Sequence, residues 1–228
     1  MEKWNKTNDR FIGFLDIMGF KDYVFRNSHN AVKKKMELFH NVIKDNESYI
    51  QSIGKKANKD TVIRTSIFSD AILVISESKN DKSLEALTAF CSSMFRNCIE
   101  RGIPIKGAIS CGKITADFEK SLFFGKALID AYLLGEECFM YGIVADNKVE
   151  KLIKSHKTGF GDQFAYGKVP MKSGFINHYA VNWYSNRFPE LAPIESIEAF
   201  YDTVAGRPRK YVDNTLDFAN KYFVHKST

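Results

Sequence analysis

Between residues 11 and 24 the chain reads FIGFLDIMGFKDYV. Apolar, β-prone residues lead to an acid, Asp16, and a turn containing Gly19 separates them from the start of a helix. A carboxylate at the end of a strand is placed to hold a hard cation, and the N–H groups of such a turn point outward, where they bind phosphate oxygens. An Asp at a strand-to-helix junction also caps helices, so this stretch alone does not decide between the two roles.

A second acid, Asp70, falls in a predicted hairpin. β-prone residues at 61–68 and 71–76 flank the polar pair Ser69-Asp70, which is the pattern of two strands joined by a tight turn. The alternative is an ordinary turn aspartate. Two aspartates on rigid turns suit two Mg²⁺ or Mn²⁺ ions, which take further ligands from water and substrate phosphate. Such a pair activates an attacking hydroxyl and stabilises a leaving oxygen, as nucleotidyl transfer requires.

Four ordered motifs resemble class III nucleotidyl cyclases. Residues 14–20, FLDIMGF, resemble the Phe-x-Asp-Ile-x-Gly-Phe signature of that family, and Asp70 falls where the family places its second metal-binding Asp. Residues 106–112, KGAISCG, resemble its Gly-x-x-x-Gly strand, and residues 124–134, FGKALIDAYLL, resemble its glycine-led helix. The resemblance spans about residues 10–146. Within the family, GAISCG and ALIDAYLL are most similar to the pyrimidine cyclases of Pycsar anti-phage systems.

This resemblance implies an activity, a cofactor and partners. The activity is conversion of UTP or CTP, with UTP favoured, to the 3′,5′-cyclic monophosphate and pyrophosphate by two Mg²⁺ or Mn²⁺ ions. The family builds its site at the interface of a head-to-tail homodimer, and a separate effector protein binds the cyclic nucleotide during infection. The implied site residues are Asp16 and Asp70 for catalysis and metal binding, the Ile17 carbonyl as a further metal ligand, and the amides of Met18, Gly19 and Phe20 for the triphosphate.

The chain departs from purine cyclases at two places. Ser66 stands four residues before Asp70, where purine cyclases carry a base-reading Lys, and a serine is consistent with a pyrimidine base. By spacing from Gly125, the Asn and Arg that stabilise the transition state are replaced by Ile129 and Leu133. The cations near the motifs that could take over from the Asn and Arg are Arg64, Lys106, Lys113 and Lys126. By analogy, Lys168 and Lys172 are candidates for binding the β- and γ-phosphates.

Two other functions fit parts of the pattern. A catalytically inactive cyclase-like domain that binds nucleotide and signals through dimerisation is favoured by the missing Asn and Arg, while retention of both aspartates argues against it. A palm-like polymerase or diguanylate cyclase shares the two-metal logic. However, residues 68–72 read FSDAI and lack the Gly-Gly-Asp/Glu-Glu-Phe hairpin of diguanylate cyclases.

Composition indicates an ordinary globular protein, with 228 residues, 44% hydrophobic and 26% charged. We expect one domain over residues 1–228, with a core at about 10–146 and a C-terminal elaboration at 147–228. Apolar runs are too short to span a membrane, and residues 1–10 have no signal-peptide core, so we expect a cytoplasmic protein with no membrane partner. The net charge of +6 is spread along the chain, which suits an anionic substrate more than direct nucleic-acid binding. The four cysteines lack metal-ligand spacing and are expected to be buried free thiols.

The periodicity predicts an α+β fold. Strands at 10–15, 61–68, 71–76 and 105–111 alternate with a short helix after residue 17 and longer helices at 28–53 and 83–100. This βααββαβ order is typical of a ferredoxin-like sandwich with an antiparallel sheet and helices on one face. The glycine-led helix and a strand at 143–145 extend it. The C-terminal extension is predicted to contain a strand at 175–184 and helices at 194–203 and 214–222.

Overall fold

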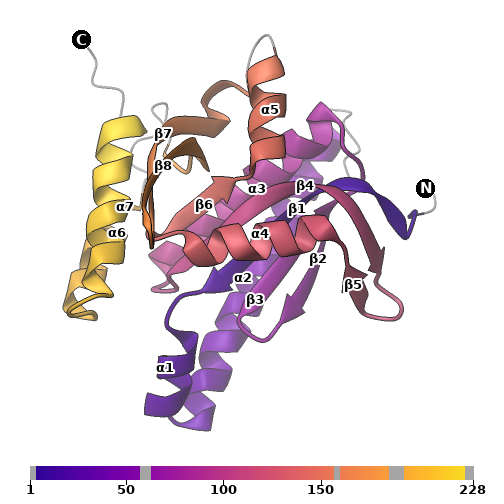
Figure 1. Ribbon diagram of the computed structural model, residues 1–228. Coiled ribbons are helices and arrows are strands. Elements are labelled where there is room, and N and C mark those ends of the chain that lie inside the picture. The colour runs from indigo at the N-terminus through magenta and orange to yellow at the C-terminus, as the bar shows by residue number, and fades with distance from the viewer. Residues whose placement is uncertain (1–3, 57–62, 157–159, 185–192, 224–228) are drawn as a thin grey trace.

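The computed structural model describes residues 4–56, 63–156, 160–184 and 193–223. Within these ranges an eight-stranded sheet has the order β2-β3-β1-β4-β6-β8-β7, and β5 pairs with β4 (Figure 1). The strands are β1 (Thr7–Ile17), β2 (Ile63–Phe68), β3 (Ala71–Ser76), β4 (Ile105–Asp117), β5 (Leu122–Phe124), β6 (Gly142–Ala145), β7 (Phe164–Met171) and β8 (Gly174–Val181). The helices are α1 (Phe20–Arg26), α2 (His29–Lys56), α3 (Asp81–Glu100), α4 (Lys126–Glu137), α5 (Asn147–Ser155), α6 (Ile194–Glu198) and α7 (Arg209–Tyr222), with 3₁₀ turns at Gly161–Gln163 and Ala199–Asp202.

Helices cover both faces of the sheet. Figure 1 shows α4 crossing one face, and α2 and α3 lie on the other. On β1, alternate side chains turn to opposite faces: Phe11 and Leu15 enter the core beneath α2 and α3, whereas the Phe14 ring meets the Tyr132 ring of α4 edge to face at 5.4 Å. The end of β1 therefore presents its side chains to two different layers.

The predicted stripe of α3 forms the main core. Its inward residues are fully buried, and they are Leu84, Leu87, Phe90, Cys91, Met94, Phe95 and Cys98. Apolar residues at this spacing line one side of a helix, which buries them together against the sheet. All four cysteines are buried and free, as expected. None of the described helices combines the length and apolar character needed to cross a bilayer.

Two glycines lie where α4 packs on the sheet, one required by the neighbouring strand and one by the contact with α4. A Cβ on Gly107 of β4 would stand 2.2 Å from the Phe14 carbonyl oxygen, a distance that excludes any side chain. Across the layer, a Cβ on Gly135 of α4 would stand 3.2 Å from the Cα of Gly107. The glycine-containing strand and helix predicted from the sequence thus meet at a backbone contact, which fixes the C-terminal end of α4 over the end of β1.

The sheet differs from the expected one in two respects. It is mixed, because β4 and β6 are parallel, with Lys106 opposite Gly142. A chain that leaves one strand, crosses by a helix and returns beside it must run parallel to it, and α4 is that crossover. Second, α4, which lies outside the βααββαβ core, buries its small residues Ala127, Ala131 and Gly135 on the opposite face. The long helices of the core, α2 and α3, share one face as expected.

Element boundaries differ mainly in length. The strand expected at 105–111 continues to Asp117 and returns as β5, and β7, which pairs with β8, was not anticipated. The helix expected at 194–203 is a short α6 followed by a 3₁₀ turn. The helix α2 runs on through Lys56 into the expected polar loop, and the rest of that loop and the expected start of β2 at 61–62 lie outside the described residues.

Candidate functional site

Asp16 and Asp70 meet at one end of the sheet because β1 and β3 are paired. Asp16 is opposite Ala71, the residue that follows Asp70. The Ile17 N–H donates to the Asp70 carbonyl oxygen at 3.0 Å, which joins the two chain segments directly. In the turn before Asp70, Ser69 has a φ of 53°, the left-handed conformation that tight hairpin turns use. Two motifs that are 54 positions apart in the sequence therefore form one corner of the fold.

A cross-strand row extends this corner over four strands. Phe68, Ala71, Asp16 and Lys106 lie opposite one another in turn on β2, β3, β1 and β4. Directly opposed residues of antiparallel strands share a face, so the side chains of Asp16 and Lys106 lie on the α4 side of the sheet. Ser66 is two residues from Phe68 and shares that face. The predicted base-binding position is thus on the same face as Asp16.

Lys106 is held by an acid that the sequence analysis did not single out, Glu136 at the end of α4. The Lys106 side chain is 3% exposed, and its Nζ lies 3.5 Å from Glu136 Oε1 and donates to the Glu136 carbonyl oxygen at 3.0 Å. Lys172 Nζ lies 3.6 Å from Glu136 Oε2. Two predicted cations therefore meet at one carboxylate. No motif marked Glu136, because its role depends on how α4 packs.

The carboxyl group of Asp16 has an unusual affinity for its proton. Burial, followed by the negative charges of Asp70 and Glu136, raises its pKa to about 7, while Lys106 acts in the opposite sense. Burial also lowers the pKa of Lys106, and the charge of Glu136 opposes that shift. Clustered groups with shifted pKa values are typical of functional sites. Near neutral pH the Asp16 carboxyl group can therefore lose its proton when a metal cation binds.

The available carboxylates limit the metal chemistry. Within the described ranges, no three His, Cys, Asp or Glu side chains are grouped as metal ligands. A structural zinc centre needs such a group, whereas Mg²⁺ needs only one or two carboxylates and completes its shell with water and phosphate. Asp16 and Asp70 match this second donor set, and their mutual repulsion would be relieved by a divalent cation between them.

The turn after β1 offers fewer free amides than the sequence suggests. The Met18 N–H donates to the Pro104 carbonyl oxygen at 2.8 Å, which removes it from the predicted triphosphate donors. The amides of Gly19 and Phe20 donate to no described residue, as is usual at the start of a helix. Gly19 has a φ of 72°, so the turn needs the conformational freedom of glycine.

The outer face of α4 is apolar and uncovered. Ile129 and Leu133, which occupy the slots of the family's Asn and Arg, are 54% and 55% exposed. Tyr132 beside them is 45% exposed, and Phe68 on the hairpin is 84% exposed. Together these four residues form what we name the α4 apolar patch. Large apolar side chains exposed together on one side of a helix commonly mark an interaction site.

The fold does not bring Arg64 or Lys168 to the aspartates. Arg64 is four residues before the end of β2, about 13 Å along the strand from the turn that carries Asp70. Its guanidinium lies 4.5 Å from the centroid of the Trp4 ring. Lys168 is exposed on β7, the strand at the opposite edge of the sheet from β2. Neither can act on a nucleotide held by Asp16 and Asp70 of its own chain.

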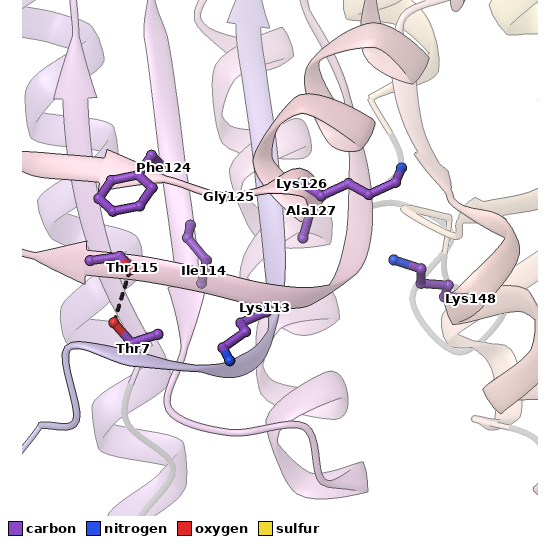
Figure 2. A pocket seen from close by; sticks show the side chains of 9 residues that line it. All are labelled: Thr7, Lys113, Ile114, Thr115, Phe124, Gly125, Lys126, Ala127 and Lys148. Atoms are coloured by element: carbon purple, nitrogen blue, oxygen red, sulfur yellow. Dashed lines mark hydrogen bonds between the residues drawn. The ribbon is translucent and has the colours of Figure 1, made fainter.

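Lys126 lies at the other end of α4, beside a shallow pocket of about 460 Å³. Its Nζ pairs with Asp130 at 2.5 Å, and the Nζ of Lys148 lies 3.7 Å from the same carboxylate. Figure 2 shows the amine of Lys113 on the far side of the pocket from those of Lys126 and Lys148. These amines do not converge on one point, and Lys126 is separated from Asp16 by most of the helix.

No family model and no curated protein matches the sequence. Solved structures do match. A bacterial light-regulated adenylyl cyclase aligns over 86% of this chain and 57% of its own, with 12% identity and a TM-score of 0.51. The adenylyl cyclase CyaB from P. aeruginosa aligns over 78% of this chain and 96% of its own, with 17% identity and a TM-score of 0.47. The guanylyl cyclase Cya2 aligns over 78% and 92%, with 13% identity and a TM-score of 0.47. At these identities the likeness concerns the fold, which is that of class III nucleotidyl cyclases.

Proposed function

We propose that the protein is a pyrimidine nucleotide cyclase, which converts UTP or CTP to the 3′,5′-cyclic monophosphate and pyrophosphate. The observation that carries the proposal is the corner formed by Asp16 and Asp70, with the pKa of Asp16 raised to about 7. The solved structures of like fold are named as adenylyl and guanylyl cyclases, which supports nucleotide cyclisation as the class of reaction.

Asp16 and Asp70 would hold two Mg²⁺ or Mn²⁺ ions, with the Ile17 carbonyl as a further ligand. The fit rests on the donor set, because two carboxylates that repel each other through a partly buried corner favour a divalent cation. Bound there, the ions would lower the pKa of the ribose 3′-hydroxyl and neutralise the leaving pyrophosphate. Asp16 must lose its proton before it can act as a ligand, and Lys106 favours that loss.

The other residues of this end of the sheet position the substrate. The free amides of Gly19 and Phe20 donate to triphosphate oxygens. Of the two predicted phosphate-binding lysines, Lys172 is the better placed. It pairs with Glu136, the same carboxylate that pairs with Lys106. Lys106 serves as a fixed cation opposite Asp16. Because it is already held in place, it need not move when negative charge develops on the substrate.

A pyrimidine base suits Ser66. The hydroxyl of serine is both donor and acceptor, so it can pair with a carbonyl oxygen or an amino group of a small ring. A lysine at this position would present only donors and a charge. Ser66 does not distinguish uracil from cytosine, and UTP is favoured by the resemblance to the Pycsar cyclases. The same resemblance supports a role in anti-phage defence.

The working form would be a homodimer, in which a second copy covers the α4 apolar patch. The patch lies on the same face as Asp16, so a partner seated there also closes the site. The aspartates of one protomer would then face α4 of the other, in the head-to-tail arrangement of the family. The cyclic product would act on a separate effector protein.

One observation favours a second candidate, an inactive nucleotide-binding domain. Ile129 and Leu133 are exposed but apolar, and neither can stabilise negative charge on an α-phosphate. Incubation of the purified protein with UTP or CTP and Mn²⁺, with products identified by mass, separates the two candidates. A cyclic monophosphate with equimolar pyrophosphate supports the cyclase, with Asp70→Asn as the blank. Saturable nucleotide binding without product supports the inactive domain.

A further inference from the structure

A second cavity lies behind the turn that follows β1. It has a volume of about 1030 Å³, at the upper end of the range for small-molecule sites. Its walls come from residues 17–20 and α1, from Lys35 of α2, from the end of α3, and from the α6–α7 region. Figure 1 shows α1 and the C-terminal helices on the side of the molecule away from the β5 hairpin. Asp16, Asp70 and Lys106 do not line it, so the cavity does not contain the aspartates and borders the proposed nucleotide site along residues 17–20.

Two basic side chains line the cavity, the half-buried Lys35 and the exposed Arg26. Lys35 Nζ lies 4.6 Å from the centroid of the Tyr23 ring and donates to the Gly102 carbonyl oxygen at 3.3 Å. Lys35 is half-buried, and this burial lowers the pKa of its ammonium group. Neither Lys35 nor Arg26, which also lines the cavity, forms an ion pair with a described carboxylate.

Two acids line the same cavity and limit the charge of an occupant. Glu100 is engaged, because its Oε2 lies 3.9 Å from the guanidinium of Arg101. Asp22 forms no ion pair with a described residue and would repel an anion placed near it. The lining thus holds two cations and two acids, and Asp22 would repel a doubly charged group more strongly than a singly charged one. A carboxylate therefore fits better than a doubly charged phosphate.

Two buried tyrosines add neutral donors. Tyr141 and Tyr211 are 3% and 9% exposed, and both line the cavity. Their rings stack with centroids 5.8 Å apart, yet neither hydroxyl forms a hydrogen bond with a described residue. Neither hydroxyl oxygen is among the fully buried polar atoms without a partner, so both are accessible from the cavity that these residues line. Burial raises the pKa of Tyr141 to about 12, so this hydroxyl keeps its proton and can donate it to an acceptor.

The remaining walls are largely apolar and aromatic. Phe200 packs against Tyr141 with ring centroids 5.4 Å apart, and Phe20 and Val204 contribute further apolar surface. Flat rings are well accommodated by such walls, where edge-to-face and stacked contacts add to burial. We propose that this cavity binds a small aromatic carboxylate, with its charge at Lys35 and Arg26 and its ring among the aromatic side chains.

Occupancy of the cavity would affect the turn. Met18, Gly19 and Phe20 line it from one side, while the amides of Gly19 and Phe20 are the free donors on that turn. A bound molecule would therefore fix the donors that we assign to the triphosphate. This consequence rests on the proposed function, whereas the binding site itself does not.

The binding test uses 1-naphthoate and its uncharged analogue 1-naphthylmethanol, titrated calorimetrically into the full chain without nucleotide. We expect saturable binding of 1-naphthoate, at least about tenfold tighter than that of the alcohol, and a loss of about tenfold in Lys35→Met. Lys34→Met, an exposed neighbour on the same helix, is the matched control and should bind as the unaltered chain does. Val204→Trp, which fills the cavity, should abolish binding. Absence of binding, equal binding of both probes, or an unaltered affinity in Lys35→Met would each overturn the proposal.

Coupling to the turn is tested separately by titrating UTP with and without saturating 1-naphthoate. We expect the UTP affinity to change by at least about threefold in the unaltered chain and to stay constant in Lys35→Met. An unchanged UTP affinity in the unaltered chain would overturn the coupling to the turn. It would not affect the proposal that the cavity binds an aromatic carboxylate. Because binding of 1-naphthoate is measured without turnover, an inactive enzyme would not affect that result. A correctly folded Lys35→Met is verified by its melting temperature.

Discussion

Asp16 on β1 lies directly opposite Lys106 on β4, on the face of the sheet that α4 covers. The pair is not a simple ion pair, because Lys106 is engaged by Glu136 and Asp16 is repelled by Asp70 and Glu136. The balance raises the pKa of Asp16 to about 7, so this carboxyl group holds its proton more tightly than an exposed aspartic acid does. A divalent cation binds the same carboxylate oxygens as this proton, so metal binding and protonation of Asp16 compete.

Replacing Asp16 by Asn should remove metal binding without unfolding the chain. Asn keeps the shape of Asp and removes the repelled charge, so the metal-free variant should melt about 2–4 °C higher than the unaltered protein near pH 8. The increase in melting temperature on adding Mn²⁺ should disappear, and cyclase turnover should fall by at least about a thousandfold. Asp9→Asn, at the exposed start of the same strand, is the control and should change neither quantity. Mn²⁺ stabilisation that persists in Asp16→Asn would contradict the metal assignment.

Metal affinity should depend on pH with a midpoint near 7. The pKa of Asp16 is raised in the folded chain, so the folded state retains its proton longer than the unfolded state does. Stability of the metal-free protein should therefore fall as pH rises from about 4 towards 7. The affinity for Mn²⁺ should rise about tenfold per pH unit below 7 and level off above it. Calorimetric titration of Mn²⁺ between about pH 5.5 and about pH 8.5 measures this, and a flat profile would exclude Asp16 as the titrating ligand.

Lys106 should set the position of that midpoint. In Lys106→Met the apolar stem remains while the charge is lost, so the pKa of Asp16 should rise further and the midpoint should shift upward by about half to one pH unit. Lys126→Met at the other end of α4 should leave the midpoint in place. The readout is the pH profile of Mn²⁺ binding, which a purely structural role of Lys106 would not shift. An unchanged midpoint in a folded Lys106→Met would contradict the coupling between the two residues.

The α4 apolar patch should mediate self-association. Leu133→Glu places a charge at its centre and should weaken the dimer by at least about tenfold, as measured by sedimentation velocity over a range of concentrations. Leu122→Glu, on the β5 hairpin outside the patch and 47% exposed, is the matched control. A monomeric unaltered protein, or a dimer that tolerates Leu133→Glu, would place the interface elsewhere.

The sequence predicts the parts of this fold that depend on local pattern. Asp16 ends a run of apolar residues before Gly19, and Asp70 sits between two β-prone runs, so both positions follow from neighbouring residues. The core face of α3 follows from its period for the same reason. These are the parts on which the structure and the expectations agree.

Other features depend on contacts between distant segments. Glu136 is an ordinary surface acid in sequence, and only the close packing of Gly107 on Gly135 brings it to Lys106. The Met18 amide is lost as a donor through Pro104, a contact that no local pattern encodes. Arg64 is near Asp70 in sequence but distant in space, because extended strands separate residues faster than helices do. The parallel pairing of β4 with β6 follows from the path of α4, which the periodicity of either strand does not specify.

The most direct test of the central claim is a competition between substrates. The purified protein is incubated with Mn²⁺ and an equimolar mixture of UTP, CTP, ATP and GTP, and the cyclic products are quantified by mass, with Asp16→Asn as the blank. We expect one dominant cyclic pyrimidine nucleotide, cyclic UMP, and no cyclic product from Asp16→Asn. A dominant cyclic purine product would contradict the role assigned to Ser66. No cyclic product from any of the four would contradict the assignment of this chain as a cyclase.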